Sequence, residues 1–170
     1  VLHGDVKPLN VVEMDHTWRL LDLDVSARFG GGMGTRKLPS SGYSAPEVMR
    51  TLREGDELRA DISMDLWSLG ATLFTLASGT TLLPSDLDDN LRGGDDAWRL
   101  CNWSAAQRDD RLHAAELTKT MSGKRLVDLL SKLLEPSSET RLLHFGGPGG
   151  VDAAKVVLQH PFFKGDADED

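Results

Sequence analysis

A run of apolar residues near the middle of the chain constrains the fold most. Between residues 64 and 76, large apolar side chains recur at helical spacing: Leu66, Leu69, Leu73 and Leu76, among Trp67, Ala71 and Phe74. Asp61 is suited to cap such a helix, and Gly79 is suited to end it. Because apolar side chains lie nearly all round this helix, we expect it in the middle of a domain and not on its surface.

The start of the chain predicts a β-hairpin. Residues 11–12 and 18–21 are short apolar pieces, and the turn-rich tripeptide Asp15-His16-Thr17 separates them. Such a hairpin would fix Asn10 at one end and Asp22 at the other, so that the oxygens of both side chains converge on one ion. The segment from Asp24 to Tyr43, which is rich in glycine, then predicts a loop.

Further apolar patterns predict three more helices: over residues 112–117, over residues 126–134 before Pro136, and over residues 153–158 before Pro161. Strands are expected only near the start, so the fold class is mainly α with a short β-hairpin region. With 170 residues, of which 39% are hydrophobic, the chain is long enough for one domain with a real core.

Charge and cysteine content exclude several kinds of partner. The net charge of −8 argues against nucleic acid or an anionic membrane as a partner of the bulk surface. Trp98 and Trp103 are therefore expected to pack against the protein and not to stack on bases. Cys101 is the single cysteine, which fits an intracellular, cytoplasmic setting, and we expect a buried thiol there.

No apolar run approaches the ~18 residues needed to cross a bilayer, so no membrane segment is expected. Because the chain begins at Val1 without a Met, we expect it to be a fragment of a longer protein.

The first 24 residues carry the side chains that suit phosphoryl transfer. Asp5, Lys7 and Asn10 lie on one short loop, and Asp22 follows the predicted hairpin. This reaction requires a carboxylate to accept a hydroxyl proton, a cation near the moving phosphoryl group, and oxygen ligands that hold Mg²⁺ against the phosphates. The four side chains include all three kinds of group.

Six motifs follow one another in a fixed order: His3 to Asn10, Asp22-Leu23-Asp24, Ala45-Pro46-Glu47, Asp65 to Gly70, Arg141 after Glu135-Pro136, and His160-Pro161-Phe162. Together they resemble the C-terminal lobe of a eukaryotic-type protein kinase. The resemblance covers nearly the whole chain. It implies a lobe over residues 1–165, followed by an acidic tail over residues 166–170, with the N-terminal lobe absent from this chain.

The resemblance implies a role for each chemical residue. Asp5 is similar to the base that accepts the substrate hydroxyl proton, and Lys7 to the lysine that contacts the transferred phosphate in serine/threonine kinases. Asn10 and Asp22 are similar to the ligands of the Mg²⁺ that accompanies ATP. Ser40 falls where the family has a Ser or Thr near its peptide-binding loop.

The resemblance also implies structural roles: a buried ion pair between Glu47 and Arg141, a hold on the catalytic loop by Asp65, an apolar stack beneath the adenine that includes Val12 and Leu76, and a second stack that includes His3 and Leu23. Loss of one partner of the ion pair is expected to cost about 3–5 kcal/mol.

Two departures from the family pattern carry information. Gly4 stands where most members have an arginine that receives the phosphate of a phosphorylated activation loop. We therefore expect activity not to depend strongly on phosphorylation of Thr35, Ser40 or Ser41. Asp24 stands where the family has glycine, and its Cβ is expected to stiffen the triplet.

These residues favour a serine/threonine protein kinase whose substrate is a protein hydroxyl. The N-terminal lobe of the same full-length chain would supply the remaining ATP contacts, so the fragment alone is expected to be inactive. The alternative is a pseudokinase that acts as a binding or scaffolding module. Kinases of small molecules are a third option, which the Ala45-Pro46-Glu47 motif and the segment from Asp65 to Gly70 disfavour.

Overall fold

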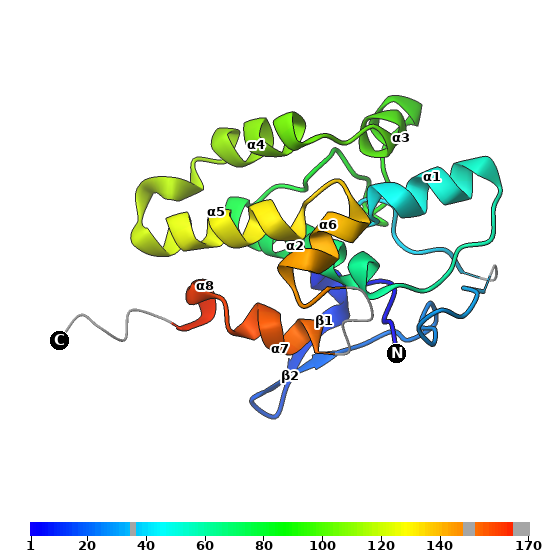
Figure 1. Cartoon of the computed structure of the whole chain (residues 1–170), viewed down its shortest axis with the longest axis horizontal. Coiled ribbons are helices and arrows are strands. Elements are labelled where there is room, and N and C mark those ends of the chain that lie inside the picture. The colour runs from blue at the N-terminus through cyan, green and yellow to red at the C-terminus, as the bar shows by residue number, and fades with distance from the viewer. Residues whose placement is uncertain (35–36, 148–151, 165–170) are drawn as a thin grey trace.

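The computed structural model describes residues 1–34, 37–147 and 152–164, and these are mostly helical, with one two-stranded antiparallel sheet (Figure 1). The sheet consists of β1 (Val11–Met14) and β2 (Thr17–Leu20). The helices are α1 (Pro46–Glu54), α2 (Ile62–Ser78), α3 (Gly94–Cys101), α4 (Ala105–Ala114), α5 (Met121–Leu133), α6 (Ser138–His144), α7 (Ala153–Leu158) and α8 (Pro161–Lys164). The predicted mainly α class with a short β-hairpin is confirmed, whereas the predicted acidic tail lies outside the described residues.

Helix α2 is the centre of the molecule, as its sequence predicts. The Asp61 carboxylate caps it by accepting a hydrogen bond from the Ser63 amide at 2.8 Å, and Gly79 ends it in the left-handed conformation. Helices α5 and α6 pack against α2 (Figure 1). Burial is not complete all round, however, because Leu76 in the last turn is 67% exposed.

Glycine at position 70 allows α2 and α5 to approach closely. A Cβ at this position would lie 2.8 Å from the Cβ of Leu133 and 3.0 Å from Cδ2 of Leu134. Real side chains do not tolerate such contacts, so the short distance between these two helices depends on Gly70. The leucines that predict α5 all face this contact or the core around it: Leu126, Leu129, Leu130, Leu133 and Leu134 are all buried.

The predicted hairpin is present, with strands longer than the apolar pieces alone indicate. Its register runs from Val11 opposite Leu20 to Met14 opposite Thr17. Asp15 and His16 form the turn with φ of 51° and 57°, which is the left-handed pair that a tight hairpin with native twist requires.

One more backbone hydrogen bond continues the ladder beyond the strands. The Leu21 amide donates to the Asn10 carbonyl at 2.8 Å. Asn10 and Asp22 therefore both lie at the open end of the hairpin.

Two helix predictions need correction. Helix α5 begins at Met121 and ends at Leu133, whereas the sequence predicts a helix over residues 126–134. The helix expected over residues 112–117 is instead α4, which ends at Ala114 and is followed by a short 3₁₀ helix, Leu117–Lys119. The α4 helix begins earlier because Ser104 and Gln107 form a reciprocal capping box. Helix α7 has the predicted bounds.

The two tryptophans differ in their surroundings. Trp103 is buried and lies edge-on to Trp67, with ring centroids 5.8 Å apart. Trp98 in α3 is 55% exposed, so the expectation that it packs against the protein is wrong. Cys101, at the end of the same helix, is buried as expected. Within the described ranges, every helix is too short or too polar to span a membrane.

Candidate active site

The buried Asp5 carboxylate is the centre of the candidate site. Its Oδ1 accepts a hydrogen bond from the Ser40 amide at 2.8 Å. The Asn10 side-chain amide donates to Asp5 Oδ2 at 3.2 Å and to the Asp5 carbonyl at 2.8 Å. Three residues that the sequence singles out, Asp5, Asn10 and Ser40, therefore meet at one point although Ser40 lies 35 positions from Asp5.

The Lys7 ammonium lies beside this carboxylate. Its Nζ is 2.7 Å from Ser40 Oγ, 3.8 Å from Asp5 Oδ2 and 3.0 Å from Asp89 Oδ2. Lys7 was expected near Asp5, whereas Ser40 was expected near the peptide-binding loop. Asp89 was not expected, because an acidic run in the sequence is read as a solvated face and carries no sign of a tertiary contact.

The loop backbone is held from the central helix by Asp65. The two carboxylate oxygens of Asp65 accept hydrogen bonds from the amides of His3 at 2.8 Å and Gly4 at 2.9 Å. Burial raises the pKa of the Asp65 carboxyl, and the two amide hydrogen bonds partly oppose this shift.

His3 is buried, and its ring contacts both the loop and the residue that follows β2. Its Nδ1 accepts a hydrogen bond from the Asp5 amide at 3.2 Å, and its Nε2 lies 2.9 Å from the Leu21 carbonyl. The tautomer that satisfies both contacts carries its proton on Nε2, so the ring ties the loop to Leu21, the residue that follows β2. The geometry gives His3 a structural place and not the place of a base.

Asp22 lies at the open end of the hairpin, and it has a left-handed backbone and a lysine partner. Its φ is 64°, a left-handed value that costs a non-glycine residue about 1–2 kcal/mol. Lys37 donates to Asp22 Oδ2 at 2.6 Å and to Asp24 Oδ2 at 3.4 Å. The hydrogen bond from Lys37 is the largest cause of the lowered pKa of Asp22. No sequence signal identifies Lys37 as the partner of this carboxylate.

The side chains assigned to the two apolar stacks differ in their exposure. Leu23 is 64% exposed, whereas His3 is buried. Val12 is half-buried, and Leu76 is largely exposed. All three apolar residues are therefore accessible on the surface that surrounds the hairpin and the end of α2.

The ion pair that the sequence suggests between Glu47 and Arg141 is present. Arg141 Nη1 lies 2.6 Å from Glu47 Oε1, and the guanidinium is fully buried. This pair joins the N-terminus of α1 to α6. It lies in the structural core and not at the Asp5 carboxylate.

Gly4 fills a place where a side chain does not fit. It has a φ of 84°, and a Cβ there would lie 2.9 Å from the Val25 carbonyl and 3.1 Å from Met33 Cε. Val25 and Met33 are buried, so apolar packing holds residues 25–33 against the loop. Thr35, one of the three residues whose phosphorylation was considered, lies outside the described residues.

Replacing Gly4 by arginine, the residue usual in the family, is expected to destabilise the fold by about 1–3 kcal/mol, because the new side chain must displace Met33 and adopt a left-handed backbone. Urea unfolding followed by circular dichroism measures the change. Gly34→Arg is the matched control, since a Cβ at Gly34 meets nothing within 4 Å. Equal losses for both variants would contradict the packing explanation.

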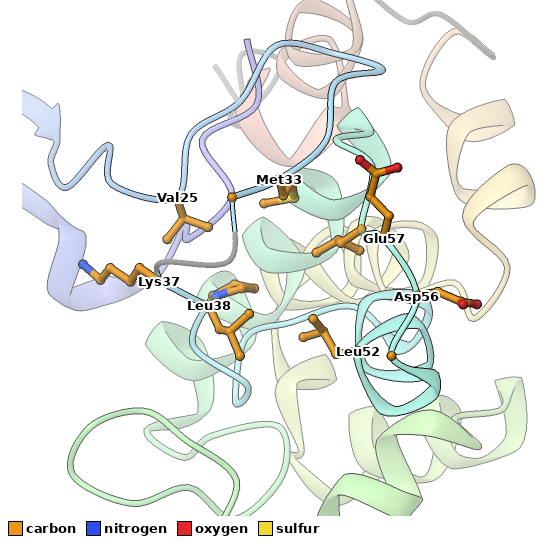
Figure 2. A pocket seen from close by; sticks show the side chains of 11 residues that line it. Val25, Met33, Lys37, Leu38, Leu52, Asp56 and Glu57 are labelled. Atoms are coloured by element: carbon orange, nitrogen blue, oxygen red, sulfur yellow. The ribbon is translucent and has the colours of Figure 1, made fainter.

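A cavity of about 290 Å³ lies between this packed segment and the end of α1 (Figure 2). Val25, Met33, Leu38 and Leu52 line its apolar part. The acidic residues at the rim, Asp56 and Glu57, lie on the opposite side from Lys37, which extends toward Asp22.

The fold and the residues around Asp5 define a protein of the kinase class, and comparison with known proteins agrees. A family model described as the protein kinase domain matches residues 1–163. The chain therefore belongs to the protein kinase family.

Curated relatives include the gamma catalytic chain of phosphorylase b kinase, liver/testis isoform, from Mus musculus, which is 27% identical over 96% of this chain. Ribosomal protein S6 kinase alpha-1 from Homo sapiens is 29% identical over 95% of this chain. The chain spans 36% of the length of the first relative and 20% of the second.

Solved structures agree on the fold. The autoinhibited serine kinase domain of the giant muscle protein titin matches 96% of this chain and 44% of its own length, with a TM-score of 0.64 and 21% identity. The twitchin kinase region from C. elegans matches 95% of this chain and 24% of its own length, with a TM-score of 0.58 and 23% identity.

Proposed function

We propose that this chain is the C-terminal lobe, residues 1–165, of a serine/threonine protein kinase that transfers the γ-phosphoryl group of ATP to a protein hydroxyl. The N-terminal lobe of the full-length protein would complete the ATP site. The observation that carries the proposal is the meeting of Asp5, Lys7, Asn10 and Ser40 at one point. The curated relatives are named as kinases of phosphorylase b and of ribosomal protein S6, which supports a protein as the substrate.

The roles follow from the contacts. Asp5 would accept the proton of the substrate hydroxyl, because its carboxylate is fixed by two hydrogen bonds and lies next to the loop around Ser40. Lys7 would neutralise charge on the moving phosphoryl group, since its ammonium lies 3.8 Å from the same carboxylate. Neither role requires the chain to form a covalent intermediate.

Asn10 and Asp22 would hold Mg²⁺, which neutralises the phosphates when bound. The side-chain amide nitrogen of Asn10 donates both of its hydrogen bonds to Asp5. The amide oxygen is therefore the atom that remains for a cation. One carboxylate and one amide oxygen fit Mg²⁺, which commonly takes few protein ligands and completes its shell with phosphates and water. Lys37 must leave Asp22 for this ligation.

The test is phosphotransfer by the full-length protein with ATP and Mg²⁺ on a Ser/Thr peptide library. Asp22→Ala is expected to lower kcat/KM about 100-fold, because it removes a metal ligand. Asp24→Ala removes a neighbouring carboxylate of the same charge and is expected to have a much smaller effect. Equal losses for both variants would indicate general loss of charge and would contradict the assignment of Asp22 as a ligand.

A pseudokinase is the second candidate, and one observation favours it. The Lys37 ammonium contacts the Asp22 carboxylate at 2.6 Å and therefore competes with a metal ion for it. If this pair persisted in the full-length protein, the chain would act as a binding module. Retained partner binding together with no phosphotransfer by the wild-type protein, at any Mg²⁺ concentration, would favour this second function.

A further inference from the structure

Lys7 has more anionic neighbours than the proposed reaction requires. Its ammonium lies 3.8 Å from Asp5 Oδ2 but only 3.0 Å from Asp89 Oδ2. Both pairs are shielded from solvent: the exposed fractions of the Lys7, Asp5 and Asp89 side chains are 12%, 4% and 14%. Charge pairs at such distances interact more strongly than pairs on an open surface.

The backbone fixes the position of Asp89. The Gly42 amide donates to the Asp89 carbonyl at 2.9 Å, and the Leu91 amide donates to Ser41 Oγ at 2.9 Å. A Cβ at Gly42 would lie 2.7 Å from the Asp89 carbonyl oxygen, so this approach depends on glycine. The loop that carries Asp89 is therefore docked directly on the segment that follows Ser40.

The Asp89 carboxylate depends on Lys7 for its compensation. Its Oδ2 is buried and has no hydrogen-bond partner within the described residues, because the contact with Lys7 has the distance of an ion pair but not the angle of a hydrogen bond. A shielded carboxylate without hydrogen bonds is costly unless a cation lies close to it. The pair is thus a specific contact and not a chance encounter of two exposed side chains.

We propose that Asp89 is a positioning residue for Lys7: it holds the ammonium beside Ser40 and keeps it from closing onto Asp5. Without the Asp89 charge, Asp5 is the nearest remaining carboxylate, 3.8 Å from the Lys7 ammonium. The ammonium then moves into direct contact with Asp5. An Asp5 oxygen engaged in that way is a poorer proton acceptor. The inference rests on the proposed kinase function for its kinetic consequence, but the contact itself can be tested separately.

The first test is kinetic and uses the full-length protein. Asp89→Asn keeps the size of the side chain, and asparagine also tolerates the φ of 64° at this position. We expect kcat to fall on the order of tenfold, with little change in KM for ATP, because the two charges are in direct contact. Asp88→Asn, in the same loop and exposed, is the matched control and is expected to leave kcat unchanged.

A double-mutant cycle separates positioning from a general effect on the loop. In a Lys7→Met background, Asp89→Asn is expected to cause no further loss of kcat, because the residue through which Asp89 acts is gone. The same loss in both backgrounds, or a loss seen mainly in KM, would overturn the proposal.

The second test does not depend on activity. Limited acetylation with an N-hydroxysuccinimide ester, read by mass spectrometry, reports how freely the Lys7 amine moves into solvent. We expect Asp89→Asn to lower the labelling of Lys7 severalfold relative to Lys132, because the ammonium then pairs with the more deeply buried Asp5, while Asp88→Asn leaves the labelling unchanged. Unchanged or increased labelling would overturn the proposal. Lowered labelling in a protein without phosphotransfer would instead uphold the contact and reject the proposed kinase function.

Discussion

Arg141→Ala is expected to lower the free energy of unfolding by about 3–5 kcal/mol, because it leaves the Glu47 carboxylate without its buried partner. Arg141 is fully buried and uses all three of its nitrogens. It donates to both Glu47 oxygens at 2.6 and 3.3 Å, to the Ser63 carbonyl at 2.9 Å, and to the Glu135 carbonyl at 2.7 and 3.1 Å. Its guanidinium also lies 5.0 Å from the centroid of the Trp67 ring.

Urea unfolding of the chain, followed by far-ultraviolet circular dichroism, measures this loss. Arg99→Ala is the matched control, since Arg99 is largely exposed and its pair with Asp96 spans one helical turn. Arg141→Lys is expected to recover only a small part of the stability, because an ammonium cannot reach both Glu47 oxygens and two carbonyls. A loss below about 1 kcal/mol for Arg141→Ala would contradict a structural role for the pair.

The elements that the sequence predicts best are those whose signal is local and periodic. Helix α2 follows from leucines at helical spacing between a capping aspartate and a C-terminal glycine, and the structure has that helix with both caps. Helix α7 has the predicted bounds because Pro161 limits it. The hairpin follows from a turn-rich tripeptide, although its strands extend beyond the apolar residues.

Predictions failed where burial depends on distant parts of the chain. Trp98 is apolar but faces solvent in α3, whereas Trp103, five positions later, is buried against Trp67. No local pattern distinguishes the two, since the burial of Trp103 arises from its contacts with Trp67 in α2 and with the Leu134 carbonyl. The start of α4 was missed for a different reason. The capping box of Ser104 and Gln107 begins this helix without an apolar period in the sequence.

The site shows the same division. Asp5, Lys7, Asn10 and Ser40 were identified from motifs, and the structure brings them together. The contacts of Asp89 and Lys37 were not identified, because each arises when an irregular segment folds back onto the loop. Such contacts depend on tertiary backbone geometry, which neither residue type nor spacing encodes locally.

Asp5→Asn is expected to lower kcat of the full-length protein by about 10² to 10⁴-fold, the usual contribution of a general base. Asparagine keeps the size of the side chain and can still accept the hydrogen bond from the Ser40 amide, which now lies 2.8 Å from Oδ1. It cannot accept the proton of a substrate hydroxyl. KM for ATP is expected to change little, because no proposed ATP contact is removed.

Phosphotransfer to a Ser/Thr peptide under saturating ATP and Mg²⁺ measures the loss, and thermal unfolding of the variant checks that the fold is intact. Asp15→Asn is the control, since Asp15 lies in the exposed hairpin turn, where asparagine also tolerates the φ of 51°. A folded Asp5→Asn variant with more than about a tenth of the wild-type kcat would reject Asp5 as the base. Because Asn10 and Ser40 hold the Asp5 carboxylate on both oxygens, the site would then serve to organise the loop and not to accept a proton.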